Sequence, residues 1–331
     1  MGALLAWARR LLTRKQGHGQ PQPAAEGARE VVGRTVGYWD QAHTAIGDSP
    51  AFPGSWTSHP VVRAAVMRRI SGRSDLDWIE WVKQRFLPHG VERALSMGCG
   101  AGHCDRAAGK VGLFRSLDGI DVSSAAIALA VERANKAGLS GLSYRVADIN
   151  TELLPQEAYD LVVFKQSLHH VDALEHVLGQ VQRTLRPRAW LVLNEFIGPS
   201  RLQWTDEQLA IANELLAALP ERLRQVAGAA GRIRQQIERV PLTHFATADP
   251  SEAVRSAEIV PLLSAGFEIV ERRDFGGTIL YPLLQDIIDN FDPARDADNA
   301  LLRLLLAFED QLLARRILPS DNAVIVARRP D

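Results

Sequence analysis

The stretch that most constrains the fold runs from Val91 to His103. An apolar segment, which predicts a buried strand, ends in Gly98, Gly100 and Gly102, and a helix-compatible stretch follows. Glycine suits such a turn because it adopts positive φ and because its missing Cβ lets a ligand approach the backbone and the positive end of the next helix. The stretch therefore predicts the strand, turn and helix of a nucleotide-binding α/β unit.

The spacing of these glycines bears on which ligand the turn would bind. The dinucleotide fingerprint needs its third glycine one position later, where this chain has His103. This argues against NAD. A structural tight turn explains a glycine trio about equally well, so the ligand has to be argued from residues downstream.

Acidic residues end the next two predicted strands. Residues 117–121 predict a second strand ending at Asp121, and residues 142–148 predict a third ending at Asp148. Because the carboxyl ends of neighbouring parallel strands line one crevice, both carboxylates are expected beside the glycine turn. A carboxylate at Asp121 suits a ribose, whose two hydroxyls are hydrogen-bond donors.

The glycine turn with Asp121 and Asp148 resembles the class I S-adenosylmethionine-dependent methyltransferases, a Rossmann-like family, and in particular bacterial enzymes of small-molecule and glycan pathways. The resemblance implies S-adenosyl-L-methionine as cofactor, with Asp121 binding its ribose and Asp148 its adenine amino group. Many members carry an acidic residue at the position of Ser96, which leaves open how the cofactor's amino group is held. The cofactor-binding residues expected on this basis are Ser96, Gly98, Cys99, Gly100, Gly102, Asp121, Val122, Asp148, Ile149 and Gln166.

Strands and helices alternate after the glycine turn. Further strands are predicted at residues 159–164, 189–195, 267–275 and 322–328, and helices include one that begins at the N-cap Ser123 and stops at Gly138. Other helices are predicted at residues 252–265, 280–291 and 301–313. This alternation predicts an α/β fold with a doubly wound, seven-stranded, mostly parallel sheet. The resemblance implies that the last strand is antiparallel and lies beside the fifth.

The chain divides into five predicted segments. Residues 1–30 form a disordered or amphipathic tail, 31–90 an N-terminal helical lid, and 91–196 the cofactor-binding core. Residues 197–256 form a helical insertion over the acceptor, and 257–331 complete the sheet with flanking helices. A frayed tail is favoured over a basic helix lying on an anionic membrane.

The amino-acid composition limits which classes of partner and which location are expected. A net charge of −1 without an arginine-rich, aromatic-interleaved patch gives no reason to expect nucleic acid. Only Cys99 and Cys104 occur, so a disulfide framework is not available and a reducing, cytoplasmic location is expected. Composition leaves the oligomeric state open.

Two adjacent histidines follow the fourth predicted strand, where class I enzymes place residues that border the transferred methyl group. Methylation of a hydroxyl needs a base, and histidine has a suitable pKa. We expect His169 to be this base and His170 to be the second choice. In the alternative, the pair only packs, and Asp172 caps the next helix.

A metal is not expected. Gln166, His169 and His170 sit where some similar quinone O-methyltransferases carry metal-binding acidic residues and a histidine, but those acidic residues are absent here. Glu195 is expected to line the acceptor pocket; alternatively it is a second acid or base, or it orients Arg201. The residues expected to bind the acceptor are His59, Glu195, Arg201 and Trp204.

These features favour a methyltransferase that acts on a small-molecule acceptor, at the hydroxyl of a metabolite or sugar. One alternative is a non-catalytic protein that binds S-adenosylmethionine or serves as a scaffold. A lesser one is an N-methyltransferase or a protein methyltransferase.

Overall fold

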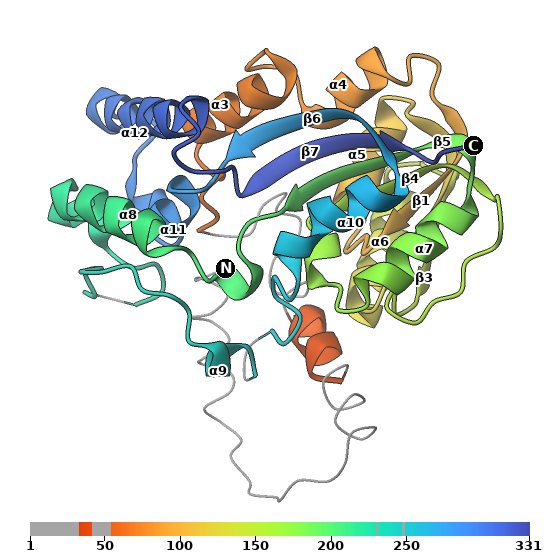
Figure 1. Ribbon diagram of the computed structural model, residues 1–331, viewed down its shortest axis with the longest axis horizontal. Helices are drawn as coiled ribbons and strands as arrows, with labels where there is room; N and C mark the ends of the chain where they lie inside the picture. The colour runs from red at the N-terminus through yellow and green to blue at the C-terminus, as the bar shows by residue number, and fades with distance from the viewer. Residues whose placement is uncertain (1–32, 42–53, 230, 247–248) are drawn as a thin grey trace, which may run out of the picture.

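The structure is a computed structural model that describes residues 33–41, 54–229, 231–246 and 249–331 (Figure 1). Its centre is a seven-stranded sheet with the strand order β3-β2-β1-β4-β5-β7-β6. Strands β1 to β5 pair in parallel, whereas β7 lies antiparallel between β5 and β6. The predicted doubly wound fold is confirmed, including the antiparallel last strand beside the fifth. The predicted N-terminal tail lies outside the described residues.

The strands end close to their predicted positions, although the second and fifth begin three and four residues earlier than predicted. The third strand stops two residues before Asp148, whose carboxylate accepts a hydrogen bond from the backbone N–H of Asn150 and so starts a turn. The strands are β1 Val91–Met97, β2 Phe114–Asp121, β3 Leu142–Val146, β4 Tyr159–Lys165, β5 Leu185–Phe196, β6 Glu268–Gly276 and β7 Asn322–Arg328.

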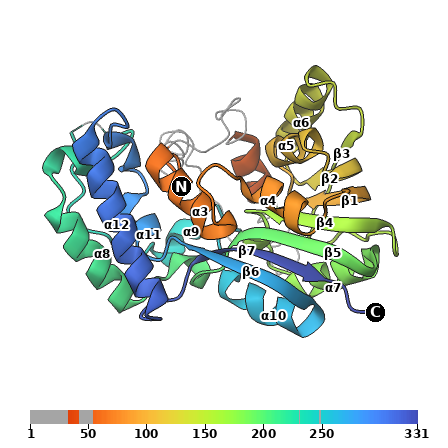
Figure 2. The same cartoon turned by 90° about the horizontal axis from the view of Figure 1, so that it is seen from above.

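Helices cover both faces of the sheet (Figure 2). One face carries α3 Pro60–Ser71, α4 Trp78–Arg85, α5 His103–Lys110 and α6 Ser124–Lys136, and the other carries α7 Leu174–Thr184 and α10 Ile259–Gly266. Successive side chains along a strand point to opposite faces and pack in two separate cores. In β1, for example, Ala94 packs on the first face and Leu95 on the second. The described helices include none that is long and apolar enough to cross a membrane.

Helix starts follow local capping chemistry. The Ser123 side chain accepts from the backbone N–H of Ala126 and caps α6, as predicted. Helix α7 differs, because its N-cap is Ala173 and Asp172 does not cap it. The Asn150 side-chain oxygen instead accepts from the backbone N–H groups of Asp172 and Ala173.

The insertion after β5 is less helical than predicted. Helix α8, Asp206–Ala218, starts at a capping box, and among the described residues of the insertion the helices after it are the short η3 Glu221–Arg224 and α9 Leu242–Phe245. The helix predicted from residue 252 begins only with η4 Ser256–Glu258 and α10. Residues 249–255 therefore form a loop, and this loop carries Glu252.

The remaining helices lie beyond the carboxyl ends of β5 and β6 (Figure 1). The stretch predicted as one helix at residues 280–291 is divided into α11 Leu280–Leu284 and η5 Ile288–Asn290, and α12 Asp296–Ala314 is longer than predicted. Helix α11 packs against both α8 and α12, so the three helices form one layer at this end of the sheet.

A buried carboxyl group links this helical layer to β7. Asp321 Oδ2 accepts hydrogen bonds from Trp204 Nε1 at 3.2 Å and Gln208 Nε2 at 3.1 Å. Burial, with a smaller contribution from the charge of Glu309, raises the pKa of Asp321 to about 8.

Folding stability should therefore depend on pH through Asp321. The unfolded chain loses this proton near pH 3.8 and the native state only near pH 8, so the native state binds more protons in between and its stability falls as pH rises. We expect Asp321→Asn to be more stable than the wild type at pH 8, by roughly 1–3 kcal/mol, and to lose this advantage towards pH 4. Urea unfolding at pH 5 and pH 8 measures the difference. An equal effect from Asp206→Asn, at an exposed carboxylate, would contradict this explanation.

Candidate active site

The glycine turn is closely packed on both sides. Gly98, Gly100 and Gly102 have φ values of +68°, +53° and +67°, a region that favours glycine. A Cβ on Gly98 would lie 2.5 Å from Ser167 Cβ, and one on Gly102 would lie 2.6 Å from Tyr144 Oη. There is no space for a side chain at Gly98 or Gly102, so a ligand at this turn would contact the backbone directly.

The Asp121 carboxylate is bound to the glycine turn at the end of β2. Its Oδ2 accepts from the backbone N–H of Gly100 at 2.8 Å, and its Oδ1 accepts from that of Ser123 at 2.9 Å. A carboxylate accepts up to about four hydrogen bonds, so this arrangement is compatible with a ribose diol. Asp148 lies half-buried in the turn after the neighbouring strand β3. The structure therefore places the residues predicted to bind the ribose and the adenine at or just beyond the ends of two adjacent strands.

An acidic residue that sequence reasoning missed lies near Ser96. Asp105, on the first turn of α5, is only 2% exposed. Burial raises its pKa to about 6, while the hydroxyls of Ser96 and Tyr144 lower it by a smaller amount. Its position three residues after the glycine turn, at the positive end of a helix, was the available sequence signal.

The other predicted cofactor residues lie just beyond the carboxyl ends of β1 to β4. Cys99 is half-buried, and burial raises the pKa of its thiol well above the ordinary value. Val122 and Ile149 are half-buried next to the two aspartates. Gln166 has φ +53°, which is strained for a residue with a side chain, and its Nε2 donates to the Asn194 carbonyl oxygen at 3.2 Å. Its side chain thus connects the ends of β4 and β5.

His169 and Glu195 form a buried pair. His169 lies on the short helix η1, Leu168–His170, and its Nδ1 is 2.7 Å from Glu195 Oε2. Glu195 is fully buried, and its Oε1 accepts from the backbone N–H groups of Ser167 and Leu168 at 2.7 and 2.8 Å. Because a carboxylate only accepts, Nδ1 carries the proton of the neutral imidazole, and in that form Nε2 has a lone pair.

Two opposing effects act on the pKa of His169. Burial lowers it, but the charge of Glu195 and the hydrogen bond to Glu195 outweigh burial and bring the pKa above the ordinary value. Glu195 therefore stabilises the protonated imidazole. The prediction that Glu195 orients Arg201 is wrong, because both carboxylate oxygens bind η1 and the residue before it.

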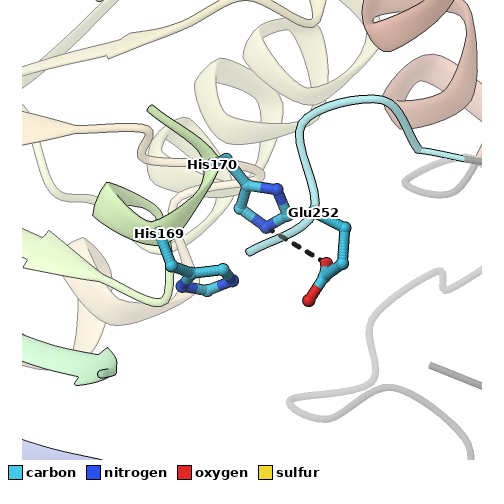
Figure 3. Close-up of side chains that lie close together, drawn as sticks. All are labelled: His169, His170 and Glu252. Atoms are coloured by element: carbon cyan, nitrogen blue, oxygen red, sulfur yellow. Dashed lines mark ion pairs between the residues drawn. The ribbon is translucent and has the colours of Figure 1, made fainter. Parts of the chain in front are cut away.

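His170 contacts the loop of residues 249–255 (Figure 3). Its Nδ1 is 3.1 Å from Ser251 Oγ and 3.4 Å from Asp249 Oδ2, and its Nε2 is 3.8 Å from Glu252 Oε2. Burial, together with the neighbouring His169, lowers the pKa of His170 well below the ordinary value, and burial raises the pKa of Glu252 to about 7. Two buried acidic residues thus approach the histidine pair from the insertion.

Arg201 holds this loop in place. Its Nη1 donates to the carbonyl oxygens of Pro250 at 2.6 Å and Glu252 at 3.1 Å, and its guanidinium lies 5.2 Å from the centre of the Phe245 ring. Arg201 also has φ +56°, a conformation that these contacts stabilise. Its contacts fix the backbone of the loop that carries Glu252. The role of Arg201 towards an acceptor stays a prediction.

The other two residues predicted to bind the acceptor have structural partners. Trp204 donates to Asp321 and packs edge-on against Tyr281, with 5.6 Å between ring centroids. His59 caps α3, with Nδ1 accepting from the backbone N–H of Val61 at 3.2 Å. Across the described ranges, neither residue has a hydrogen bond, ion pair or ring contact with His169 or His170. Their role towards an acceptor stays a prediction.

The helix over residues 33–41 lies against both parts of the site. The Trp39 ring meets the His170 ring edge-on at 5.0 Å. Asp40 Oδ1 accepts from Ser123 Oγ at 2.6 Å and from the backbone N–H of Ala125 at 3.1 Å. This segment thus joins the start of α6, next to Asp121, to the histidine pair.

Comparison with known proteins agrees with this geometry. Residues 89–253 match a family described as a methyltransferase domain. Aklanonic acid methyltransferase DauC of Streptomyces sp. (strain C5) is 38% identical over 78 residues, 23% of this chain and 36% of the relative. The 27-O-demethylrifamycin SV methyltransferase of Amycolatopsis mediterranei (strain S699) is 32% identical over 108 residues, 32% of this chain and 39% of the relative. The chain thus spans little more than a third of either curated relative.

Solved structures share the fold over nearly the whole chain. A geranyl diphosphate methyltransferase in complex with GPP and sinefungin has a TM-score of 0.52 at 14% identity, covering 90% of this chain and 99% of the other. The [4+2]-cyclase SpnF has a TM-score of 0.50 at 18% identity, covering 95% and 99%. At these identities the likeness shows the fold alone. The matching domain, the strand order and the site at the carboxyl ends of the strands together show that this chain belongs to the class I S-adenosylmethionine-dependent methyltransferases.

Proposed function

We propose that the protein transfers the methyl group of S-adenosylmethionine to a hydroxyl of a small-molecule acceptor, a metabolite or a sugar. The observation that carries the proposal is the His169–Glu195 pair, which follows β4 and packs next to the glycine turn through Ser167. Each of the two curated relatives is named after a small molecule, and these names support an acceptor of this class.

In this proposal the cofactor lies against the glycine turn. When bound, it supplies an already activated methyl group. Asp121 accepts hydrogen bonds from the ribose hydroxyls and Asp148 from the adenine amino group. The protein's main tasks are then to align the acceptor and to exclude water.

His169 is the proposed base. Its Nε2 lone pair accepts the hydroxyl proton, and the Glu195 carboxylate stabilises the imidazolium that results. Glu195 also keeps the imidazole in one tautomer through its hydrogen bond to Nδ1. His170 is the second choice, but its low pKa makes it the weaker base.

Two segments are proposed to cover the acceptor. Residues 31–90 act as a lid, supported by the contact of Trp39 with His170. Residues 197–256 act as a cap, supported by the loop that brings Glu252 and Asp249 to the histidine pair. The proposed location is the cytoplasm, which the two free cysteines, Cys99 and Cys104, support.

A protein that binds the cofactor without methyl transfer is the alternative. The likeness to SpnF, named as a cyclase, favours considering it, because one fold serves unrelated reactions. An N-methyltransferase is a further alternative, for which no base is needed when the acceptor is an unprotonated amine. Mass spectrometry of metabolite extracts treated with the protein and labelled cofactor would identify the acceptor and distinguish the three.

Cofactor binding is tested at Asp121. We expect Asp121→Asn to weaken S-adenosylhomocysteine binding by roughly 1.5–3 kcal/mol, or about tenfold or more, because the ribose loses its charged acceptor. Isothermal calorimetry measures the change, and NAD should not bind. The control is Asp118→Asn, on the same strand, where the carboxylate binds Arg93. Binding of NAD without S-adenosylhomocysteine would overturn the assignment.

A further inference from the structure

Three potential metal ligands converge at the end of β4. His169 and His170 come from η1 and Glu252 from the facing loop, and Figure 3 shows their side chains pointing towards one another. One ligand atom from each, a ring nitrogen or a carboxylate oxygen, lies within 4.8 Å of the other two. Around a tetrahedral Zn²⁺, with bonds of roughly 2.1 Å, ligand atoms lie about 3.4 Å apart. The 3.8 Å between His170 Nε2 and Glu252 Oε2 is close to that value.

Hydrogen bonds fix the imidazole tautomers that a metal requires. Glu195 accepts the Nδ1 proton of His169, which leaves the Nε2 lone pair for a cation. For His170, Ser251 Oγ donates its own proton to Asp249 Oδ1 at 2.6 Å and therefore accepts from Nδ1. A histidine that binds metal through one nitrogen and a carboxylate through the other is a common arrangement, in which the carboxylate orients the ring.

The acidic side of this cluster is not satisfied. Within the described part of the chain, the Glu252 carboxylate has an ion-pair contact with His170 and no hydrogen bond, although Glu252 is only 7% exposed. Asp249 Oδ2 is buried and has no hydrogen bond, only the 3.4 Å ion-pair contact with His170 Nδ1. A buried carboxylate with so few hydrogen bonds is costly, and a bound cation would compensate for this cost.

We infer that His169, His170 and Glu252 form a binding site for a divalent first-row transition metal, with Asp249 next to it. Two imidazoles and a carboxylate suit Zn²⁺, Co²⁺ or Fe²⁺ better than Mg²⁺, which prefers oxygen ligands. No metal was expected from the sequence, because the metal-binding acidic residues that similar quinone O-methyltransferases carry near the histidine are absent here. In the structure the acidic ligand is Glu252, which lies 82 positions further along the chain than His170.

A metal at this site goes beyond the proposed reaction and limits the role that His169 can have in it. The Nε2 atom of His169 has one lone pair, so it cannot bind a metal and accept a proton at the same time. A bound metal would therefore prevent His169 from acting as the base. Metal binding can be measured without cofactor or acceptor, which separates a failure of this inference from a failure of the proposed function.

The experiment uses untagged, full-length protein after treatment with a chelator. Zn²⁺ is titrated by isothermal calorimetry, and Co²⁺ by visible absorption, which reports coordination by the protein. We expect one site per chain, with affinity reduced roughly 10–100-fold or more in Glu252→Gln and in His170→Gln. The matched controls are Glu207→Gln and His89→Gln, at exposed positions, and both should bind like the wild type.

Two results would overturn the metal site. One is the absence of stoichiometric binding by the wild type, and the other is an equal loss in the exposed controls, which would indicate surface binding. S-adenosylhomocysteine binding by each variant shows whether it is folded. If one of the two site variants fails to fold, the other still tests the metal site. Turnover of the zinc-loaded protein then tests the base: inhibition supports His169 as base, whereas activation would support a catalytic metal and refute that role.

Discussion

Replacing His169 with alanine is expected to lower turnover by roughly 10²–10⁴-fold while S-adenosylhomocysteine affinity stays close to that of the wild type. The physical reason is that the variant lacks the group that accepts the hydroxyl proton, whereas the glycine turn and Asp121 are unchanged. Single-turnover kinetics on the identified acceptor, combined with calorimetry, measures both quantities. His89→Ala, at an exposed histidine far from β4 in sequence, is the control and should retain turnover.

A subtler variant tests the same role. In Glu195→Gln the side-chain amide would donate to Nδ1 of His169, which moves the ring proton to Nε2 and removes the lone pair there. Turnover should then fall nearly as far as in His169→Ala, even though the imidazole remains. Near-normal turnover in both variants would place the base elsewhere, or indicate an acceptor that is already nucleophilic, such as an amine or thiolate.

The second large effect is expected for Gly98→Ala. The φ value of +68° alone costs roughly 1–3 kcal/mol for a residue with a side chain, and the new Cβ would lie 2.5 Å from Ser167 Cβ. Ser167 cannot move freely, because its Oγ donates to the Met97 carbonyl oxygen at 2.7 Å and its N–H donates to Glu195. The substitution should therefore lower stability and reduce S-adenosylhomocysteine affinity more than tenfold.

Urea unfolding and calorimetry together measure these two effects. The matched control is Gly179→Ala, in helix α7, where an added Cβ meets no atom within 4 Å. That variant should bind normally and unfold at the same or a higher urea concentration, because alanine favours helices. If Gly98→Ala behaved like Gly179→Ala, the glycine turn would not be the cofactor site.

Local sequence patterns predicted the cofactor half of this molecule well. Each of the first three predicted strands ends at a glycine or an acidic residue, and the structure places Asp121 and Asp148 at or just after their strand ends. Such features depend on residues close together in the chain. The third strand is two residues shorter than predicted, because the Asp148 carboxylate accepts a hydrogen bond from the backbone N–H of Asn150 and the chain turns there instead of continuing the strand.

The acceptor half was harder to predict, because its contacts join distant residues. The carboxylate of Glu195 reaches back 26 positions to His169, and the carbonyl oxygen of Glu252 receives the Arg201 guanidinium across 51. The helical pattern from residue 252 also suggested a regular helix, whereas the contacts of Arg201 hold residues 250–253 as a loop. No periodicity in the sequence identifies such partners.

The position of β7 has a consequence for how the chain folds during synthesis. In the described chain, β6 pairs only with β7, and β5 has β7 on its second edge, so residues 322–328 complete both. Trp190 pairs with Arg328 across 138 positions, a separation that makes this contact slow to form. Until β7 emerges from the ribosome, the growing protein exposes the two strand edges that β7 later covers, and such edges are templates for aggregation. Binding of a chaperone to nascent chains should therefore persist until this last strand emerges.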